Sequence, residues 1–532
     1  MTRWALPFCW LSIVLSAKAQ ITYQDLKKAD PHNWLTYSGS YSSERHSLLK
    51  QIDTRNVQRL VAAWIFHVPN EERLECVPVV VDGVMYVTQQ TGVVYALDGR
   101  TGRLIWSYHY PSSPSTEDRG PNRGVAVYGN RVYFTTQDAF LVALDARTGN
   151  FLWRSKIAEA REGYWAPAAP LALNGKIITG AAPGDYGMDG LIVAFDATTG
   201  KQLWRWNAVP RPGEPGNATW AGDSWKHGGG DTWLTGSYDP ELNLVYWGIG
   251  NPAPDFNGDV RKGDNLYTEC MVALDADTGK LRWYFQFTPH DTADWDAVEI
   301  PVLVDHVFDG RMRKLLVQAD RNGFYYVLDR TNGEFLYGAP FVRKLNWASG
   351  LTKDGRPIRI PGVEASVQGA EVCPAVDGAT NWMSPAYSPE TGYFYLEALE
   401  GCQLQLKAAQ TFRPGGFPYD ATGMEDIPGA PLQTYVRALD LTTGKLHWEY
   451  KLIGAREYGA GVISTAGGLL FAGSPQGSFI AFDAKTGKVV WHFNTGQQIS
   501  ASPITYSFNG KQYVAVAAGS DVMAFTLFNT SQ

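Results

Sequence analysis

Two aspartates that stand two residues apart, Asp294 and Asp296, are prominent among the residues that could do chemistry. They belong to an irregular stretch, 288–296, and carboxylates serve proteins as general bases and as ligands of hard metal ions. In an extended segment, side chains two residues apart point to the same side. Both carboxylates could therefore face one partner, and the alternative interpretation of Asp296 is a solvated loop acid.

Trp233 is a second candidate, because it follows the glycine-rich run 228–230 and lies outside the repeated phrase of the chain. An indole offers a flat apolar surface with a polar edge, which suits stacking against a planar ligand. The alternative is a packing role, which we assign to most of the 19 Trp. The position of Trp233 outside the repeats favours binding.

The cysteines exclude two kinds of centre. None of the five occurs in a C-x-x-C zinc pattern or in the C-x-x-C-H pattern of attached haem. They are also too few for a disulfide scaffold in a chain of this length. If the chain moves electrons, a group other than an attached haem must carry them.

A repeated phrase must position these residues. Its form, Ala-Leu/Phe-Asp-x-x-Thr-Gly-x-x-x-Trp, predicts an apolar strand, a tight Thr-Gly turn and a second strand that ends in a large aromatic residue. Most intervals between copies are close to the about 40–50 residues of one four-stranded propeller blade. A degenerate copy spans 327–337, and the full copies begin at Ala96, Ala143, Ala194, Ala273, Ala438 and Ala481.

Eight aromatic residues mark the ends of blades and predict an all-β, eight-bladed β-propeller. The first lies on a lone N-terminal strand, 60–64, whereas three C-terminal strands within 502–525 lack a fourth. We expect the N- and C-terminal strands to pair and close the ring, which makes 20–532 a single domain. The eight residues are Trp64, Trp106, Trp153, Trp204, Trp283, Tyr337, Trp448 and Trp491.

The segments between the repeats carry a specific resemblance. Together with the Trp-ended repeats, they are similar to the pyrroloquinoline quinone (PQQ)-dependent alcohol dehydrogenases over essentially all of 30–520. The resemblance implies an eight-bladed quinoprotein with PQQ on the propeller axis, a metal ion beside it, and Trp233 as the floor under the quinone. The five segments are 228–233, 238–242, 248–254, 288–296 and 320–323.

The resemblance assigns further positions to the metal and the cofactor. Asp185, Asn251 and Asp294 correspond to the metal ligands of the family, and their oxygen atoms suit Ca²⁺. The family normally has Glu where Asp185 stands. Asp296 occupies the position of an additional acid in the lanthanide-using branch, so a lanthanide is the alternative to Ca²⁺. The other positions that contact the cofactor are Glu75, Arg123, Thr136, Arg321 and Asn381.

The implied reaction is the oxidation of an alcohol to an aldehyde or ketone. Asp294 takes the hydroxyl proton as general base, hydride passes to the quinone, and an external carrier such as cytochrome c receives the electrons. Two departures from the family pattern lie near the cofactor: Asp231, which could repel an anionic ligand, and the pair 182–183, Ala-Pro. They favour the alternative of a non-catalytic or cofactor-free propeller that serves as a protein-binding scaffold.

The N-terminus predicts export. Residues 1–19 combine an early arginine, a short apolar run and an Ala-Lys-Ala cleavage pattern, which is typical of a secretory signal peptide and indicates a periplasmic protein. No later stretch is long enough to span a bilayer. The net charge of −7 gives no attraction to nucleic acid. The resemblance also implies a Cys373–Cys402 disulfide, with Cys76 and Cys270 free.

Overall fold

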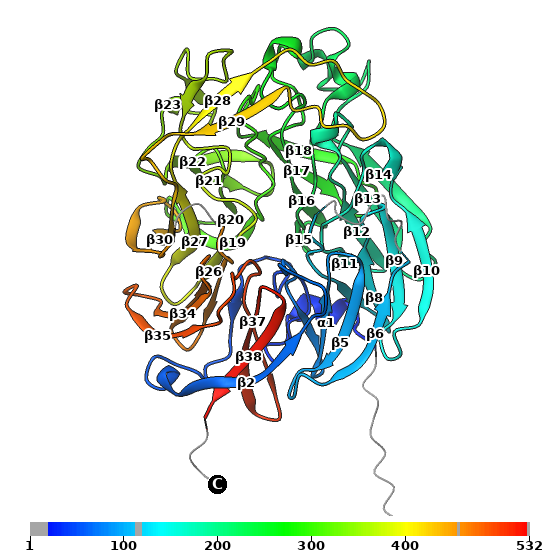
Figure 1. Cartoon of the computed structure of the whole chain (residues 1–532), viewed down its shortest axis with the longest axis vertical. Helices are drawn as coiled ribbons and strands as arrows, with labels where there is room; N and C mark the ends of the chain where they lie inside the picture. The colour runs from blue at the N-terminus through cyan, green and yellow to red at the C-terminus, as the bar shows by residue number, and fades with distance from the viewer. Residues whose placement is uncertain (1–19, 112–119, 455–457, 529–532) are drawn as a thin grey trace, which may run out of the picture.

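The computed structural model describes residues 20–111, 120–454 and 458–528, and within them eight antiparallel blades surround a central axis (Figure 1). This arrangement is the all-β, eight-bladed propeller that the repeats predict. The predicted signal peptide, 1–19, lies outside the described residues. Among the described helices, none combines the length and the apolar character needed to cross a membrane.

The first five blades follow the chain in order from the inner strand to the outer one. In the first of them, β5 is buried throughout whereas β6 is partly exposed, because neighbouring blades cover the inner strands. The strands of these blades are β3 (Val79–Val81), β4 (Val84–Thr88), β5 (Val93–Asp98) and β6 (Leu104–His109); β7 (Ala126–Tyr128), β8 (Arg131–Thr135), β9 (Phe140–Asp145) and β10 (Phe151–Lys156); β11 (Leu171–Leu173), β12 (Lys176–Gly180), β13 (Leu191–Asp196) and β14 (Gln202–Asn207); β15 (Ser237–Asp239), β16 (Leu244–Ile249), β17 (Cys270–Asp275) and β18 (Leu281–Gln286); and β19 (Val302–Phe308), β20 (Arg311–Ala319), β21 (Phe324–Asp329) and β22 (Glu334–Pro340).

Two small sheets precede and interrupt the sixth blade. They lie together at one edge of the ring in Figure 1. Their strands are β23 (Ala348–Leu351) with β24 (Pro357–Arg359), and β25 (Ala370–Val372) with β28 (Gln403–Lys407) and β29 (Thr422–Asp426). The sixth and seventh blades contain β26 (Ala386–Ser388), β27 (Tyr393–Glu400), β30 (Gln433–Asp440) and β31 (Leu446–Lys451); and β32 (Val462–Thr465), β33 (Leu469–Gly473), β34 (Ser478–Asp483) and β35 (Val489–Asn494).

The eighth blade joins the two ends of the chain, as the sequence predicts. The C-terminus supplies β36 (Ile504–Phe508), β37 (Lys511–Ala518) and β38 (Asp521–Leu527), and the N-terminus supplies β2 (Leu60–His67). β2 runs antiparallel to β38, with Trp64 opposite Ala524. Figure 1 shows the blue β2 beside the red β38. This pairing closes the ring.

Tryptophans at the blade ends join neighbouring blades. The Trp106 indole packs on Gly149 in the Thr-Gly turn of the next blade, and its Nε1 donates a hydrogen bond to the Ala146 carbonyl at 3.1 Å. Two features require glycine at position 149. Its φ of 73° lies in the left-handed region, and a Cβ there would lie 2.6 Å from the indole. Equivalent pairs are Trp64–Gly102, Trp153–Gly200, Trp204–Gly279, Trp283–Gly333 and Trp448–Gly487.

The N-terminal segment 32–46 crosses the interior of the ring. It follows α1 (Tyr23–Lys28) and ends in β1 (His46–Ser47), which pairs in parallel with β32. Backbone groups of this segment form hydrogen bonds with the innermost strands of six blades. The buried Arg45 guanidinium donates to the carbonyls of Tyr37, Val462 and Pro503. The segment therefore forms a floor across the central channel.

The connections between strands place the predicted site residues at one end of the ring. The chain reverses at every connection of an antiparallel blade, so loops between blades and loops between second and third strands open on the same end. The Thr-Gly turns open on the other end. The predicted site residues lie in the first kind of connection: Glu75, Arg123, Trp233, Asp294, Asp296 and Asn381 between blades, and Thr136, Asp185, Asn251 and Arg321 between second and third strands.

Replacement of Gly149 tests the tryptophan–glycine contact. We expect Gly149→Ala to lower the free energy of unfolding by about 2–5 kcal/mol, because the new methyl group overpacks against Trp106 and a left-handed backbone disfavours a side chain. Gly510 is the matched control, since it has the same φ of 73° and nothing within 4 Å of the Cβ position. Gly510→Ala should cost only about 1–2 kcal/mol. Denaturant unfolding measures both variants, and equal losses would contradict the indole contact.

Candidate functional site

Three aspartates meet at the end of the ring that carries these loops. Asp185, Asp255 and Asp294 each place a carboxylate oxygen within 4.8 Å of the other two. Asp185 and Asp294 are predicted metal ligands, whereas Asp255 is not predicted from the sequence. Carboxylates this close repel one another unless protons or a cation lie between them. The group therefore fits a hard metal ion such as Ca²⁺.

Asn251, the third predicted ligand, is fully buried. Neither the oxygen nor the nitrogen of its side-chain amide has a hydrogen-bond partner among the described residues. Its backbone N–H donates to Asp296 Oδ1 at 2.9 Å, which links it to the segment that carries Asp294. An unpaired buried amide costs about 1–3 kcal/mol per group, and its oxygen suits a hard metal ion, so Asn251 also fits a metal site.

Local structure fixes the loops that carry the predicted carboxylates. Asp185 lies on a 3₁₀ turn, Gly184–Tyr186, whose first N–H donates to Asp231 Oδ1 at 2.6 Å. Asp231, which the sequence analysis associates with repulsion of the cofactor, thus supports the Asp185 loop. Asp294 has a φ of 58°, a left-handed conformation that Asp adopts more readily than most residues.

Arg321 and Asp296 form a buried ion pair in contact with Trp233. Arg321 Nη1 donates to Asp296 Oδ2 at 2.8 Å, and Nη2 donates to the carbonyls of Asp294 and Val376. Asp296 Oδ2 also accepts from Trp233 Nε1 at 2.9 Å. In this structure Asp296, the tentative fourth metal ligand, orients the indole and the guanidinium.

Negative charge accumulates around these aspartates. Burial, followed by the charges of Asp185 and Asp294, raises the pKa of Asp255 well above its usual range. Burial and the charges of Asp185 and Asp296 have the same effect on the pKa of Asp231. A bound cation would oppose both shifts, because it favours the charged form of each nearby carboxylate.

Trp233 lies on a hydrophobic base with a charged group over its ring. It packs against a buried cluster that includes Tyr37 and Leu234. The Arg123 guanidinium lies 4.7 Å from the centre of the Trp233 ring, and its Nη2 donates to Glu75 at 2.9 Å. Nε and Nη1 of Arg123 have no partner among the described residues. A flat indole beside unused guanidinium donors fits a planar, anionic ligand such as PQQ.

Trp382 is a second half-buried indole in this region that the sequence analysis did not find. Its ring lies 6.0 Å from the Arg123 guanidinium and 4.1 Å from the Tyr458 ring. The predicted residue Asn381 shapes the loop beneath it, because its Oδ1 accepts from the Trp382 N–H and its Nδ2 donates to the Asp377 carbonyl. The signal that identified Trp233, a tryptophan outside the repeats, applies equally to Trp382.

Thr136 is less closely connected to the other predicted residues. Its hydroxyl donates to the Asp138 carboxylate at 2.5 Å and accepts from the Phe140 N–H at 3.0 Å. These hydrogen bonds lie within its own β8–β9 turn. The structure therefore places Thr136 at the correct end of the ring and shows it stabilising a turn.

The insertion between β28 and β29 is hydrogen-bonded to segments that carry members of the aspartate group. The Tyr419 N–H donates to the Asp185 carbonyl at 2.6 Å, and the Phe256 N–H donates to the Asp420 carbonyl at 3.0 Å. This loop is thereby fastened to the segments that carry Asp185 and Asp255. It shapes the approach to both carboxylates.

A disulfide between Cys373 and Cys402 holds a further loop at the site and confirms the pairing that the resemblance implies. The bridged loop contacts the segment that carries Asp294, because the Ala375 carbonyl accepts from Trp295 Nε1 at 2.9 Å. Among the described residues, the unpaired cysteines are Cys76 and Cys270, and both are buried.

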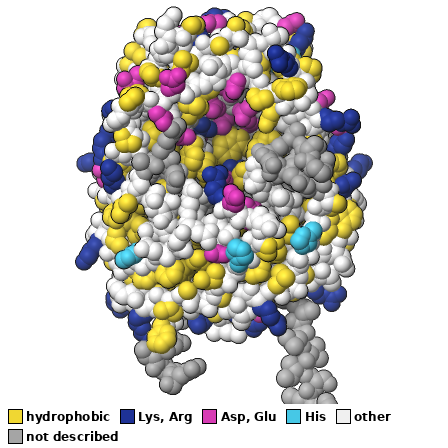
Figure 2. Space-filling view, viewed as in Figure 1, with side chains coloured by type: hydrophobic (Ala, Val, Ile, Leu, Met, Phe, Trp, Pro, Cys, Tyr) yellow, Lys and Arg dark blue, Asp and Glu magenta, His cyan; other side chains and the backbone are white. Residues whose placement is uncertain are grey.

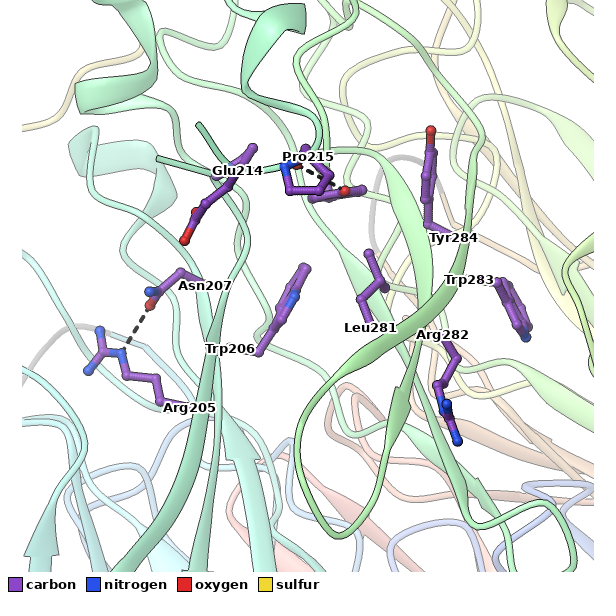
Figure 3. Close-up of a pocket in the computed structure, with 11 residues that line it drawn as sticks. Arg205, Trp206, Asn207, Glu214, Pro215, Leu281, Arg282, Trp283 and Tyr284 are labelled. Atoms are coloured by element: carbon purple, nitrogen blue, oxygen red, sulfur yellow. Dashed lines mark hydrogen bonds between the residues drawn. The ribbon is translucent and has the colours of Figure 1, made fainter. Parts of the chain in front are cut away.

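The surface has a hollow near the centre of the ring and a separate groove between two outer strands. Figure 2 shows one end of the ring hollowed near its centre, where hydrophobic, acidic and basic side chains are exposed together. A separate groove of about 660 Å³ lies between the outer strands β14 and β18, where Trp206 and Leu281 face each other (Figure 3). The predicted site residues do not line this groove, so we place the chemistry at the ring centre.

Comparisons with known proteins agree with this geometry. The chain matches the PQQ family described as "Glucose/ethanol/alcohol dehydrogenase, beta-propeller domain" over residues 34–340 and 453–514. It is 39% identical to quinoprotein alcohol dehydrogenase PedH of Pseudomonas putida, across 96% of this chain and 92% of that protein. It is 37% identical to a quinohemoprotein alcohol dehydrogenase of Comamonas testosteroni, across 92% of this chain and 72% of that protein.

A solved structure of a related enzyme is also similar to this chain. A europium-containing methanol dehydrogenase superimposes with a TM-score of 0.88 and 32% sequence identity, across 95% of this chain and 100% of that one.

Removal of the disulfide should weaken the fold and loosen the site. The bridge closes a loop with a sequence separation of 29 residues, so we expect the double variant Cys373→Ser/Cys402→Ser to lose about 3–4 kcal/mol of unfolding free energy. Denaturant unfolding measures the loss. A reductant should reproduce it in the wild type and leave the double variant unchanged, and a wild type that is insensitive to the reductant would contradict the assignment.

Proposed function

The chain belongs to the PQQ-dependent alcohol dehydrogenase family, and from this premise we propose that it oxidises an alcohol to an aldehyde or ketone in the periplasm and passes the electrons to an external carrier such as cytochrome c. It is an oxidoreductase that acts on CH–OH donors with PQQ as its cofactor. The observation that carries the proposal is the convergence of Asp185, Asp255 and Asp294 within 4.8 Å at the end of the ring where Trp233 lies.

Trp233 and two arginines provide the proposed surface for PQQ. The half-buried indole offers a face for stacking, and the unused N–H groups of Arg123 can pair with the carboxylates of the cofactor. Arg321, held by Asp296, is a second fixed donor. PQQ held by these residues would supply the hydride acceptor that alcohol oxidation requires.

Asp294 is the proposed general base. Its side chain belongs to the three-aspartate group, and Arg321 holds its backbone carbonyl at 2.6 Å. A carboxylate fixed in this way can accept the hydroxyl proton of a substrate. A cation held by Asp185, Asn251 and Asp294 would keep the Asp294 carboxylate charged, as a general base must be.

We propose a lanthanide in preference to Ca²⁺ as the bound ion. Several aspartates here repel one another electrostatically, whereas one arginine, Arg321, is paired with them. A trivalent ion balances more of this charge than a divalent one and is attracted more strongly. The similarity to a europium-containing methanol dehydrogenase supports the same choice. The aspartates are Asp185, Asp231, Asp255, Asp294 and Asp296.

The sequence supports the proposed compartment and electron carrier. Residues 1–19 resemble a cleavable export signal, which favours the periplasm. The 532 residues contain no C-x-x-C-H pattern of attached haem, which agrees with an external carrier such as cytochrome c. The alternative of a cofactor-free scaffold has less support, because a propeller that only binds proteins does not need three carboxylates within 4.8 Å of one another.

Reconstitution tests the proposed reaction. We expect the purified chain, loaded with PQQ and La³⁺, to reduce an artificial dye when a primary alcohol is added, and to be less active when Ca²⁺ replaces La³⁺. PQQ absorbance measures cofactor binding separately from turnover. If neither metal supports PQQ binding or dye reduction, the enzyme proposal is wrong.

Substitution of Asp294 tests the base. We expect Asp294→Asn to lower kcat by about 10²–10⁴-fold, because the amide cannot accept the hydroxyl proton, while the PQQ absorbance persists. Asp223→Asn is the control, since Asp223 is exposed, pairs with Lys226 and is not one of the proposed site residues. Dye-reduction kinetics compare the two variants. Equal activity in both would rule out Asp294 as the base.

A further inference from the structure

Asp255 is the member of the three-aspartate group for which neither the resemblance nor the repeats gives a role. The residue is 3% exposed, and its Oδ1 has no hydrogen-bond partner among the described residues. Burial of a carboxylate without a positive partner is strongly unfavourable. A partner from outside the chain would explain why this residue is tolerated in the interior.

A buried arginine in the same loop, Arg261, does not form an ion pair with the Asp255 carboxylate. Arg261 donates to backbone carbonyls: those of Pro254 and Asp255 at 3.0 Å and that of Asp291 at 2.6 Å. It therefore ties the Asp255 loop to the Asp294 loop without pairing with the Asp255 carboxylate. The carboxylate keeps its place beside those of Asp185 and Asp294.

The spacing of the three carboxylates is that of ligands that share one ion. Oxygen ligands of a Ca²⁺-sized ion lie about 2.3–2.6 Å from it, so two of them lie at most about 5 Å apart. The oxygens of Asp185, Asp255 and Asp294 meet this limit, since all lie within 4.8 Å of one another. Such ions take about 6–8 oxygen ligands, so the site has room for a third carboxylate.

Asp296 is less available than Asp255. Its two oxygens already accept hydrogen bonds from Asn251 N, Trp233 Nε1 and Arg321 Nη1. An ion bound by Asp296 would compete with these three donors. An ion bound by Asp255 would displace no donor from Oδ1.

We propose that Asp255 is a further ligand of the metal ion, which it binds together with Asp185, Asn251 and Asp294. The inference rests on the proposed function, because it requires that this site holds a metal. Three carboxylates match the charge of a trivalent lanthanide ion, and the loop that carries Asp255 becomes part of the metal site.

Europium luminescence tests the ligand directly. Lifetimes of bound Eu³⁺ in H₂O and in D₂O give the number of water molecules on the ion, and the measurement is made on the chain loaded with PQQ and Eu³⁺. We expect Asp255→Ala to gain at least one bound water and to bind Eu³⁺ at least tenfold more weakly. Asp223→Asn, which removes the same charge at an exposed position, should match the wild type in both respects.

Thermal unfolding of Asp255→Asn separates a ligand from a structural residue. Without metal, we expect this variant to melt at a higher temperature than the wild type, because the cost of burying a carboxyl group beside two other carboxylates is removed. The rise in Tm that Eu³⁺ produces should be smaller than in the wild type. A purely structural role for Asp255 would instead lower the metal-free Tm.

The outcomes distinguish the inference from the proposed function. If the wild type binds Eu³⁺ and Asp255→Ala has the same water count and affinity, Asp255 is not a ligand and the proposed function is unaffected. If the wild type fails to bind Eu³⁺, La³⁺ and Ca²⁺, both are overturned.

Discussion

The ring depends on indoles that each pack on a glycine of the following blade. The contact joins a broad apolar surface to one hydrogen bond, as in Trp204, which covers Gly279 and donates to the Ala276 carbonyl at 3.2 Å. Burial of a large side chain contributes about 1.5–3 kcal/mol, so repeated contacts of this kind account for much of the cohesion between blades. The site depends on the same contacts. Its residues are supplied by separate blades, and they meet only because the ring closes.

The site opposes this cohesion. Asp185, Asp231, Asp255, Asp294 and Asp296 bring like charges together at one end of a ring that is otherwise held by apolar packing. Such a cluster raises the free energy of the folded chain unless a cation is present. Ion binding and folding of these loops are therefore thermodynamically linked, and the loss of the ion should be felt first in the loops rather than in the blades.

The sequence predicts the ring better than it predicts the site. Each copy of the phrase contains a strand, a turn glycine such as Gly149, and the aromatic residue that packs on the glycine of the next copy, so the fold follows from a repeated local pattern. Asp185 and Asp294 could be found because they stand in distinctive segments. Asp255 could not be found in this way. Its approach to Asp185 and Asp294 depends on hydrogen bonds from the Arg261 guanidinium to backbone carbonyls, and no local pattern encodes them. The engagement of Asp296 by Trp233 and Arg321 is likewise a property of the assembled loops.

The N-terminal segment 32–46, which hydrogen-bonds to the inner strands of six blades, closes the channel beneath the site. The central channel of the propeller is therefore open at one end only. An alcohol must therefore enter, and the carbonyl compound made from it must leave, through the same opening of the channel. Product must then leave before the next substrate can enter, and the loop between β28 and β29 is hydrogen-bonded to the Asp185 backbone beside that opening.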